Sequence, residues 1–230
     1  MNRRLVPELM DNPNLDPVAH RQALAGLARL NSVSDAGRIL LPYLRRLSET
    51  HRRPLRILDV ATGAGDGLLP LLRRSKLWRF PLVGAGCDLS ETALDEARQR
   101  AVASGVQAEF FAHDALKSAL PMGYDVIMNS LFFHHLTDAD ISRLLQDFGR
   151  AAAVGILVND LRRSRWNRMQ VWVATRLLSR SPVVHFDGPV SVQAALTPAE
   201  LSRHAAKAGL CNAVVRTHFP CRMVLAWTKS

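Results

Sequence analysis

The chain has 230 residues, 48% of them hydrophobic, which supports one large α/β domain or a domain with a small cap. No apolar run reaches the roughly 18 residues that cross a bilayer, and no signal-peptide core is present, so we expect a cytoplasmic protein. Three cysteines without a CxxC pair predict neither a disulfide framework nor a metal centre. The net charge of +10 comes mainly from arginine and does not by itself indicate a nucleic-acid partner.

The first 50 residues predict two helices ahead of the core. Asp16 followed by Pro17 is typical of an N-cap with proline at the first helical position. Ser34 is a candidate cap for a second helix over about residues 35–48, with an apolar inner face. We therefore interpret residues 1–50 as an N-terminal helical cap.

From Leu55 onwards, short β-rich runs alternate with helical segments. The runs in this part of the chain are LRILDV, PLVGAGCDL, VQAEFFA, YDVIMNS and AAAVGILVND. Strands that alternate with helices predict a parallel sheet, because parallel neighbours require crossover connections. The chain closes with NAVVRTHF and RMVLAWT, and a link as short as Pro220 and Cys221 joins antiparallel strands. The pattern predicts a mostly parallel sheet of seven strands with an antiparallel edge strand.

Helix starts are also marked in the sequence. Ser90 is placed to cap one helix, and Thr137 with Asp140 forms a capping pattern at the start of another. Thr197, followed by Pro198 and Glu200, predicts the start of the last helix in the same way.

The turn ATGAGDG lies between the first β-rich run and a helix, as a nucleotide-binding loop does. Asp88 ends the next run, at about the distance where an acid accepts hydrogen bonds from ribose hydroxyls. A dinucleotide cofactor fits the loop and Asp88 as well as S-adenosylmethionine does. Asp59 and Asp66 separate the two cases, because they place negative charge beside a pyrophosphate but attract the ammonium and sulfonium groups of S-adenosylmethionine.

At this point LDVATGAGD resembles the first motif of the class I S-adenosylmethionine-dependent methyltransferases, in the group that includes the ubiquinone/menaquinone enzymes. The resemblance covers roughly Arg53 to Asp160 as motifs and the terminal hairpin as topology. It implies a Rossmann-like class I methyltransferase fold, α/β with helical caps, and S-adenosylmethionine as the cofactor. It also implies donor-binding residues, namely Asp59, Ala61, Thr62, Gly63 and Gly65 near the methionine part, Asp88 and Leu89 at the ribose, Asp114 and Ala115 at the adenine, and Asn129, Ser130 and Leu131 under the sulfonium.

Simpler roles stay open for some of these residues. Gly63 and Gly65 also suit a tight turn that binds nothing. Asp114 is placed to cap a following helix, with or without ligand contact. For Asp66 we favour an interaction with the positive end of the next helix over direct contact with a ligand.

Methyl transfer from a sulfonium is an in-line displacement, so the protein mainly aligns the reactants and excludes water. A hydroxyl acceptor also needs a proton acceptor, and histidine titrates close to neutral pH. His134 and His135 follow the fourth strand at the ligand-binding edge of the sheet and are the best candidates for a catalytic base. Packing or positioning is the competing role for this pair. His185, followed by Asp187 in an expected loop, is a rival base.

Residues 161–195 form an insertion that we interpret as a lid over the acceptor pocket. The run 163–180 predicts a basic amphipathic helix whose apolar stripe covers the pocket while its arginines face solvent. We expect Trp166 and Met169 of this stripe to bind the acceptor together with Phe133. The alternative is that the same stripe binds a membrane surface or a lipophilic substrate.

Residues 51–160 are then the donor-binding core, and residues 196–230 its last helix and closing hairpin. An apolar, aromatic lid favours an uncharged small-molecule acceptor over nucleic acid. The run from NDLRRSR to LTPAEL also resembles bacterial methyltransferases of polyketide, phenolic-lipid or quinone pathways. We predict an enzyme that methylates a hydroxyl of such a compound. The alternatives are C-methylation, RNA methylation and donor binding without catalysis; the sequence does not predict the oligomeric state.

Overall fold

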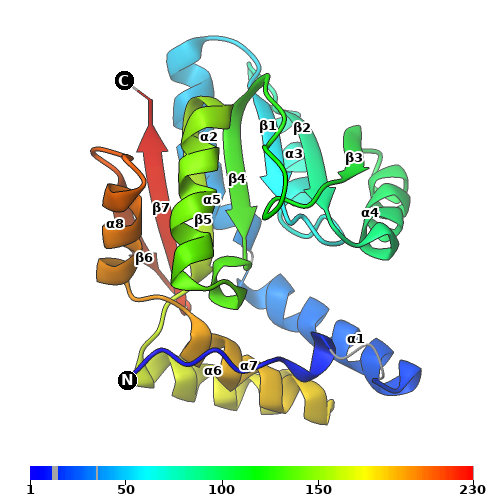
Figure 1. Cartoon of the computed structure of the whole chain (residues 1–230). Helices are drawn as coiled ribbons and strands as arrows, with labels where there is room; N and C mark the ends of the chain where they lie inside the picture. The colour runs from blue at the N-terminus through cyan, green and yellow to red at the C-terminus, as the bar shows by residue number, and fades with distance from the viewer. Residues whose placement is uncertain (12–14, 35, 230) are drawn as a thin grey trace.

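The computed structural model describes residues 1–11, 15–34 and 36–229, and it has a seven-stranded sheet at its centre (Figure 1). The strand order is β3-β2-β1-β4-β5-β7-β6. The strands are β1 (Arg56–Val60), β2 (Val83–Asp88), β3 (Ala108–Ala112), β4 (Tyr124–Ser130), β5 (Ala152–Leu161), β6 (Val214–His218) and β7 (Arg222–Thr228).

The expected mixed sheet is confirmed. Strands β1 to β5 pair in parallel, whereas β7 runs antiparallel to both β5 and β6. The closing hairpin therefore inserts its second strand beside β5 and leaves β6 at the outer edge. Because the chain crosses back from β3 to β4, the first and fourth strands are neighbours, and ligands bind at such a reversal of strand order.

Helices cover both faces of the sheet. They are α1 (Pro17–Ser34), α2 (Ala36–His51), α3 (Leu68–Ser75), α4 (Glu91–Ala103), α5 (Asp138–Ala151), α6 (Arg165–Leu178), α7 (Pro182–Ala194) and α8 (Pro198–Lys207), with short 3-10 turns η1 (Leu9–Asp11) and η2 (Phe133–His135). Side chains of β1 alternate between the layers: Leu58 and Val60 join the core cluster that contains residues of α5 and α8, and Ile57 joins the cluster that contains residues of α2, α3 and α4.

The expected helix caps form, with one exception. Ser90, Thr137 and Thr197 each accept a hydrogen bond from a backbone amide in the first turn of the following helix, and Thr197 completes a capping box with Glu200. The Asp16 carboxylate accepts from the backbone amide of Ala19 at 2.8 Å. The exception is the cap predicted at Ser34.

Ser34 is the last residue of α1, and its side chain lies outside the part of the chain that the structure describes, so the cap predicted for the second helix stays a prediction. Asp35, where that helix was expected to begin, lies outside the described residues. The described part of α2 begins at Ala36.

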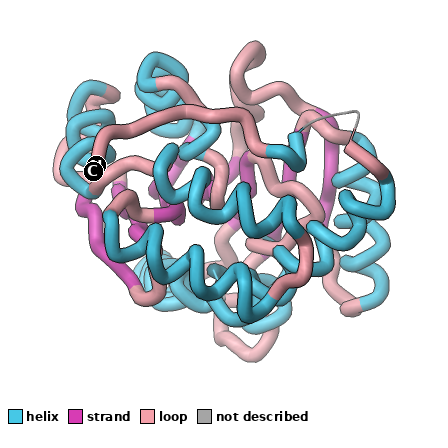
Figure 2. The backbone as a smooth tube through the Cα atoms, turned by 90° about the horizontal axis from the view of Figure 1, so that it is seen from below, coloured by secondary structure: helices cyan, strands magenta, loops and turns pink. Residues whose placement is uncertain are grey.

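The helices α1, α6 and α7 lie across the end of the sheet toward which the arrow of β4 points, and the N-terminal segment runs along them (Figures 1 and 2). Side chains hold this segment in place. The Asp187 carboxylate accepts hydrogen bonds from the backbone amides of Leu9 (2.7 Å) and Met10 (3.1 Å), and the Arg3 guanidinium donates to the carbonyl oxygen of Ala194 (2.7 Å). The cap therefore combines the beginning of the chain with residues from its second half.

The expected loop around His185 and Asp187 is instead the helix α7. Glycine and proline in this stretch favoured a loop, but Pro182 lies in the first turn, where proline is tolerated. Val184 and Val192 are fully buried, so tertiary packing outweighs the local preference. Within the described residues, no helix is both long and apolar enough to cross a membrane.

A test of the β5–β7 contact is Gly155→Ala. A Cβ at this glycine would lie 2.5 Å from the backbone carbonyl oxygen of Trp227, so one strand must shift. We expect the free energy of unfolding to fall by about 1–3 kcal/mol in urea denaturation followed by circular dichroism. Gly37→Ala in α2 is the control, since its Cβ would make only ordinary contacts, at 3.5 Å or more, with Gly67, Pro70 and Arg74. Equal stability of the Gly155 variant and the wild type would contradict this packing.

Candidate active site

The loop after β1 forms an open turn at the carboxyl end of the sheet. Ala61, Gly63 and Gly65 have positive φ angles of 55°, 54° and 77°, a region that favours glycine and strains alanine. A Cβ at Gly63 would meet no atom within 4 Å, so the turn leaves open space at this point. Strained backbone beside open space is typical of a ligand-binding loop.

Asp59 is buried beneath this loop with one carboxylate oxygen unsatisfied. Its Oδ2 accepts a hydrogen bond from Thr62 Oγ1 at 2.8 Å, whereas Oδ1 has no partner among the described residues. Burial raises the pKa of Asp59 to about 7; the hydrogen bond from Thr62 lowers it, and the charge of Asp88 raises it further. A cationic donor placed at Oδ1 would satisfy this oxygen and favour the ionised form.

Asp88 is held at the end of β2. Its carboxylate oxygens accept hydrogen bonds from the backbone amides of Gly63 (2.8 Å) and Ser90 (2.9 Å). Asp66, by contrast, pairs with Arg100 at 2.6 Å on the surface. Of the acids in and around the loop, Asp59 and Asp88 therefore have no cationic partner among the described residues, whereas Asp66 has one.

One cavity, which we call the donor cavity after the predicted donor-binding residues that line it, opens at the ends of β1, β2 and β4. It has a volume of about 420 Å³. Its walls include six of the predicted donor-binding residues, namely Ala61, Asp88, Leu89, Asp114, Ala115 and Leu131. Asp114 accepts from the backbone amide of Leu116 at 3.0 Å and so caps a turn rather than the expected helix.

Further polar atoms lie buried at the strand ends. Asn129 donates to the carbonyl oxygen of Val60 at 2.6 Å, but its Oδ1 has no hydrogen-bond partner among the described residues. The same is true of Ser130 Oγ. Unsatisfied buried polar atoms are rare, and an unplaced ligand is one explanation of such a group.

The second cavity, the acceptor cavity, lies under the helical cap and has a volume of about 290 Å³. Its apolar walls are Leu30, Leu131, Leu161, Val171, Ala174, Leu178, Pro220 and Cys221. Its polar groups are Glu8, His134, His135, Gln170, Thr175, Ser191 and Arg222. Leu131 and His135 line both cavities, so the two spaces meet at these residues.

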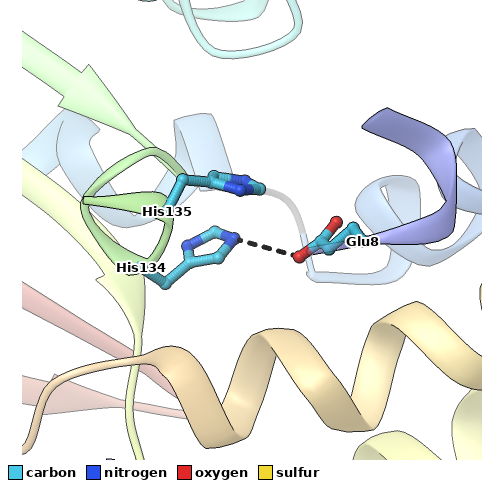
Figure 3. Close-up of side chains that lie close together, drawn as sticks. All are labelled: Glu8, His134 and His135. Carbon is cyan, nitrogen blue, oxygen red and sulfur yellow. Dashed lines mark ion pairs between the residues drawn. The ribbon is translucent and has the colours of Figure 1, made fainter. Parts of the chain in front are cut away.

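His134 is buried and oriented by Asp160 at the end of β5. Its Nδ1 lies 2.7 Å from Asp160 Oδ1, and its backbone amide donates to Asp160 Oδ2 at 3.0 Å. A hydrogen bond from Nδ1–H to this carboxylate leaves Nε2 as the lone-pair nitrogen of the neutral ring. Nε2 points toward Glu8 Oε1, 3.9 Å away (Figure 3).

Charges around His134 favour its protonated form. Burial lowers the pKa of His134, but the charge and hydrogen bond of Asp160 and the charge of Glu8 outweigh burial and the opposing charge of Arg222. The resulting pKa lies above the ordinary value of 6.5. A buried His–Asp pair with a raised pKa beside a cavity is a candidate proton acceptor.

Glu8 reaches this cluster from the N-terminal segment. Ser191 of α7 donates a hydrogen bond to Glu8 Oε1. Oxygen and nitrogen atoms of Glu8, His134 and His135 lie within 4.8 Å of one another, which is close enough to consider a metal ion. The two imidazole rings lie against each other, with centroids 4.2 Å apart and planes tilted by 37°. Since Nδ1 of His134 is held by Asp160, we interpret the cluster as a proton-accepting group and propose no metal ion here.

Three predicted acceptor-binding residues lie elsewhere. Phe133 is buried in the core against Phe148, with ring centroids 6.1 Å apart. Trp166 and Met169 are exposed on the outer side of α6. The helix was expected to turn its stripe of large apolar residues inward, but a different face, with Val171, lines the cavity. The structure therefore does not bring these three residues to the acceptor cavity.

His185 is placed away from both cavities. Its Nε2 lies 2.8 Å from the carbonyl oxygen of Ser179, and it is not among the residues that line either space. The structure therefore gives no basis for His185 as the proton acceptor, and His134 with His135 stay as candidates.

Sequence reasoning missed Asp160 and Glu8. Asp160 ends a predicted strand, so an acid at the carboxyl edge next to the histidine pair was a usable signal. Glu8 carries no such signal, since it lies in an unpatterned segment 126 positions before His134. Only the tertiary structure brings it to the cavity.

Comparisons with known proteins agree with this geometry. Residues 57–155 match the family described as methyltransferase domain. A demethylmenaquinone methyltransferase of Thermus thermophilus is 34% identical over 105 residues, which are 45% of this chain and 45% of that protein. The match thus spans less than half of the length of that relative.

Two solved structures have a similar fold. The S-adenosylmethionine-dependent methyltransferase SibL in its apo form has a TM-score of 0.73 and 16% identity, over 98% of this chain and 63% of that one. The plantazolicin methyltransferase BpumL in complex with SAH has a TM-score of 0.67 and 19% identity, over 94% and 91% of the two chains. At identities this low, the similarity shows a shared fold alone.

The electrostatics of His134 can be measured by NMR titration of its ring. We expect a pKa above 6.5 in the wild type and a lower pKa in Glu8→Gln, because that variant removes one of the charges that favour the imidazolium. Glu49→Gln, on the surface of α2, is the control and should leave the titration unchanged. A pKa that does not fall in Glu8→Gln would contradict the contact with Glu8.

Proposed function

We propose that this chain, a class I S-adenosylmethionine-dependent methyltransferase, methylates a hydroxyl oxygen of a small, largely apolar acceptor such as a phenolic, polyketide or quinone precursor. The observation that carries the proposal is the meeting of two unlike cavities at Leu131 and His135. The donor cavity has carboxylates at its walls, whereas the acceptor cavity is mainly apolar and has a buried His–Asp pair beside it.

The residues of the donor cavity, together with buried polar residues at the adjoining ends of β1 and β4, fit S-adenosylmethionine. Its ammonium group would satisfy the unpartnered Oδ1 of Asp59, and its ribose hydroxyls would donate to the carboxylate of Asp88. Asn129 and Ser130 offer further unsatisfied polar atoms at the same edge. A pyrophosphate would meet two carboxylates here, which opposes a dinucleotide. When bound, S-adenosylmethionine supplies an electrophilic methyl group on a positively charged sulfur.

The acceptor cavity suits a small apolar molecule. Apolar side chains, four of them leucine, form much of its wall, and Glu8 and His135 lie close to His134. An apolar wall disfavours water beside the reacting methyl group, which limits hydrolysis of the donor. A nucleic acid would require an open, basic groove instead, so RNA is a poor fit.

His134 is our candidate for the base. Its Nε2 would take the proton of the acceptor hydroxyl, and the O–H electron pair would stay on oxygen as the nucleophile. Asp160 holds Nδ1–H and stabilises the imidazolium that forms. His135 lies where the cavities meet and would position the acceptor.

C-methylation is the second candidate. The Thermus relative is named a demethylmenaquinone methyltransferase, and the same base would ionise a quinol hydroxyl before carbon attacks the methyl group. Donor binding without catalysis is the third candidate. Methyl labelling distinguishes O-methylation, C-methylation and donor binding without catalysis.

Donor affinity should depend on pH through Asp59. Its pKa of about 7 means that the carboxyl becomes protonated below neutral pH and loses its attraction for a cation. We expect calorimetry between pH 5.5 and 7.5 to show affinity for S-adenosylmethionine that falls several-fold as the pH drops. Asp59→Asn should bind weakly at every pH. Asp66→Asn is the control in the same loop and should behave as wild type; an equal loss in both variants would contradict the role of Asp59.

The base is tested by turnover of His134→Gln, which keeps a hydrogen-bonding side chain but removes the basic nitrogen. We expect roughly 10²- to 10⁴-fold slower methylation. The wild-type rate should rise with pH through a value above 6.5 as the imidazolium loses its proton. His185→Gln is the control and should keep the wild-type rate.

The acceptor is found by incubating cell extract with the protein, a chelator and methyl-labelled S-adenosylmethionine. Mass spectrometry should show one product with one labelled methyl, and NMR should place the label on oxygen. A label on carbon would favour the second candidate. No product from a protein that binds the donor would favour the third, and unchanged turnover of His134→Gln would exclude this histidine as the base.

A further inference from the structure

The outer face of α6, which the acceptor cavity does not use, exposes an unusual number of large apolar side chains. Five come from this single helix, and their exposed fractions are 61% for Trp166, 47% for Met169, 49% for Trp172, 41% for Val173 and 79% for Leu177. Single exposed apolar residues are normal, but a contiguous group marks an interaction surface. We call these five residues and the arginines beside them the outer face of α6.

Arginines share this face. Arg165, Arg168 and Arg176 are exposed on α6, and Arg180 follows two residues after its end. Between Leu161 and Phe186 the sequence contains no aspartate or glutamate. Within the described part of the chain, no ion pair joins these four guanidinium groups to a carboxylate. The face therefore combines exposed apolar groups with positive charge that the protein does not neutralise.

We propose that the outer face of α6 docks onto an anionic lipid surface. Amphipathic helices that lie in a membrane interface combine tryptophan and aliphatic side chains with arginine, and the arginines pair with lipid phosphates. Trp172 has the geometry for this role, since its ring packs against the Arg176 guanidinium 4.0 Å from its centroid. Tryptophan prefers the boundary between water and hydrocarbon.

The charge of the face disfavours two other occupants. A second copy of the chain packed through a two-fold axis would bring arginine against arginine, and like charges across an interface cost several kcal/mol. RNA would satisfy the arginines but would leave Met169, Val173 and Leu177 exposed, because phosphates and bases gain nothing from aliphatic chains at a phosphate track. A lipid surface satisfies both parts of the face.

The opposite side of α6 connects this surface to the site. Gln170, Val171, Ala174, Thr175 and Leu178 line the acceptor cavity. Docking would therefore place the cavity one helix diameter, about 10 Å, from the lipid. An apolar acceptor dissolved in the membrane would have a short path to it. This last step rests on the proposed function, whereas the docking itself does not.

The test is co-sedimentation of the full chain with vesicles, without donor or acceptor. We expect binding to vesicles that contain phosphatidylglycerol, weaker binding to pure phosphatidylcholine, and release by salt. Tryptophan emission should shift to shorter wavelength on binding, because two of the four tryptophans lie on this face. Failure of these measurements would leave the methyltransferase assays unaffected, so the two proposals fail separately.

Two variants examine the two parts of the face. Trp166→Ser with Leu177→Ser removes apolar area, and Arg165→Gln with Arg168→Gln removes charge; each pair should lower the partition coefficient about tenfold or more. Leu77→Ser and Arg46→Gln alter exposed residues outside the face and should bind as wild type. Circular dichroism and S-adenosylmethionine binding check that each variant folds.

Four results would overturn the proposal. The wild type could fail to bind anionic vesicles at low salt, or the face variants could bind as well as wild type. Alternatively, ultracentrifugation could show a dimer that the Trp166/Leu177 variant loses, or single-stranded RNA could bind through the arginines, in either case without vesicle binding. Each of these outcomes assigns the face to another partner or to none.

Discussion

The buried carboxylate of Asp59 is the constraint around which the candidate site is arranged. It lies at the end of β1, beneath the loop, and only one of its two oxygens has a hydrogen-bond partner in the part of the chain that the structure describes. Burying such a group without a partner raises its pKa and costs stability. A cationic ligand bound at the free oxygen would offset this loss of stability. Asp88 adds a second carboxylate nearby, and the two together explain why this edge of the sheet suits a cation better than a phosphate.

The helical cap forms much of the wall of the acceptor cavity. It brings Glu8 from the start of the chain, His134 from the turn after β4 and the inner side of α6 to one apolar space. Asp160 orients His134, so the proton-accepting nitrogen faces the cavity rather than the sheet. The same helix, α6, presents apolar and basic side chains on its other side. One element thus forms the wall of the acceptor cavity and an exposed surface.

Most of the fold could be predicted from local signals. The alternation of strands and helices, the short link before β7 and the caps at Thr137 and Thr197 each depend on residues close in sequence. The donor-binding loop was predictable for the same reason, since Asp59, the glycines and Asp88 follow the chain order of a strand, a turn and the next strand.

The acceptor side was harder, because its geometry is set by long-range packing. The stripe of Trp166 and Met169 has the period of a buried helix face, yet the smaller residues Val171, Ala174 and Thr175 face the protein. Hydrophobicity alone favoured the wrong side of the helix. The same limit applies to His185, whose surroundings became helical through burial of its neighbours.

A crystal structure from a soak with both S-adenosylmethionine and NAD would show which of the two ligands this site binds. We expect density for the sulfonium compound at the loop after β1, with its amino group within hydrogen-bonding distance of Asp59 Oδ1. Density for NAD in this place, or an amino group turned away from Asp59, would contradict this expectation.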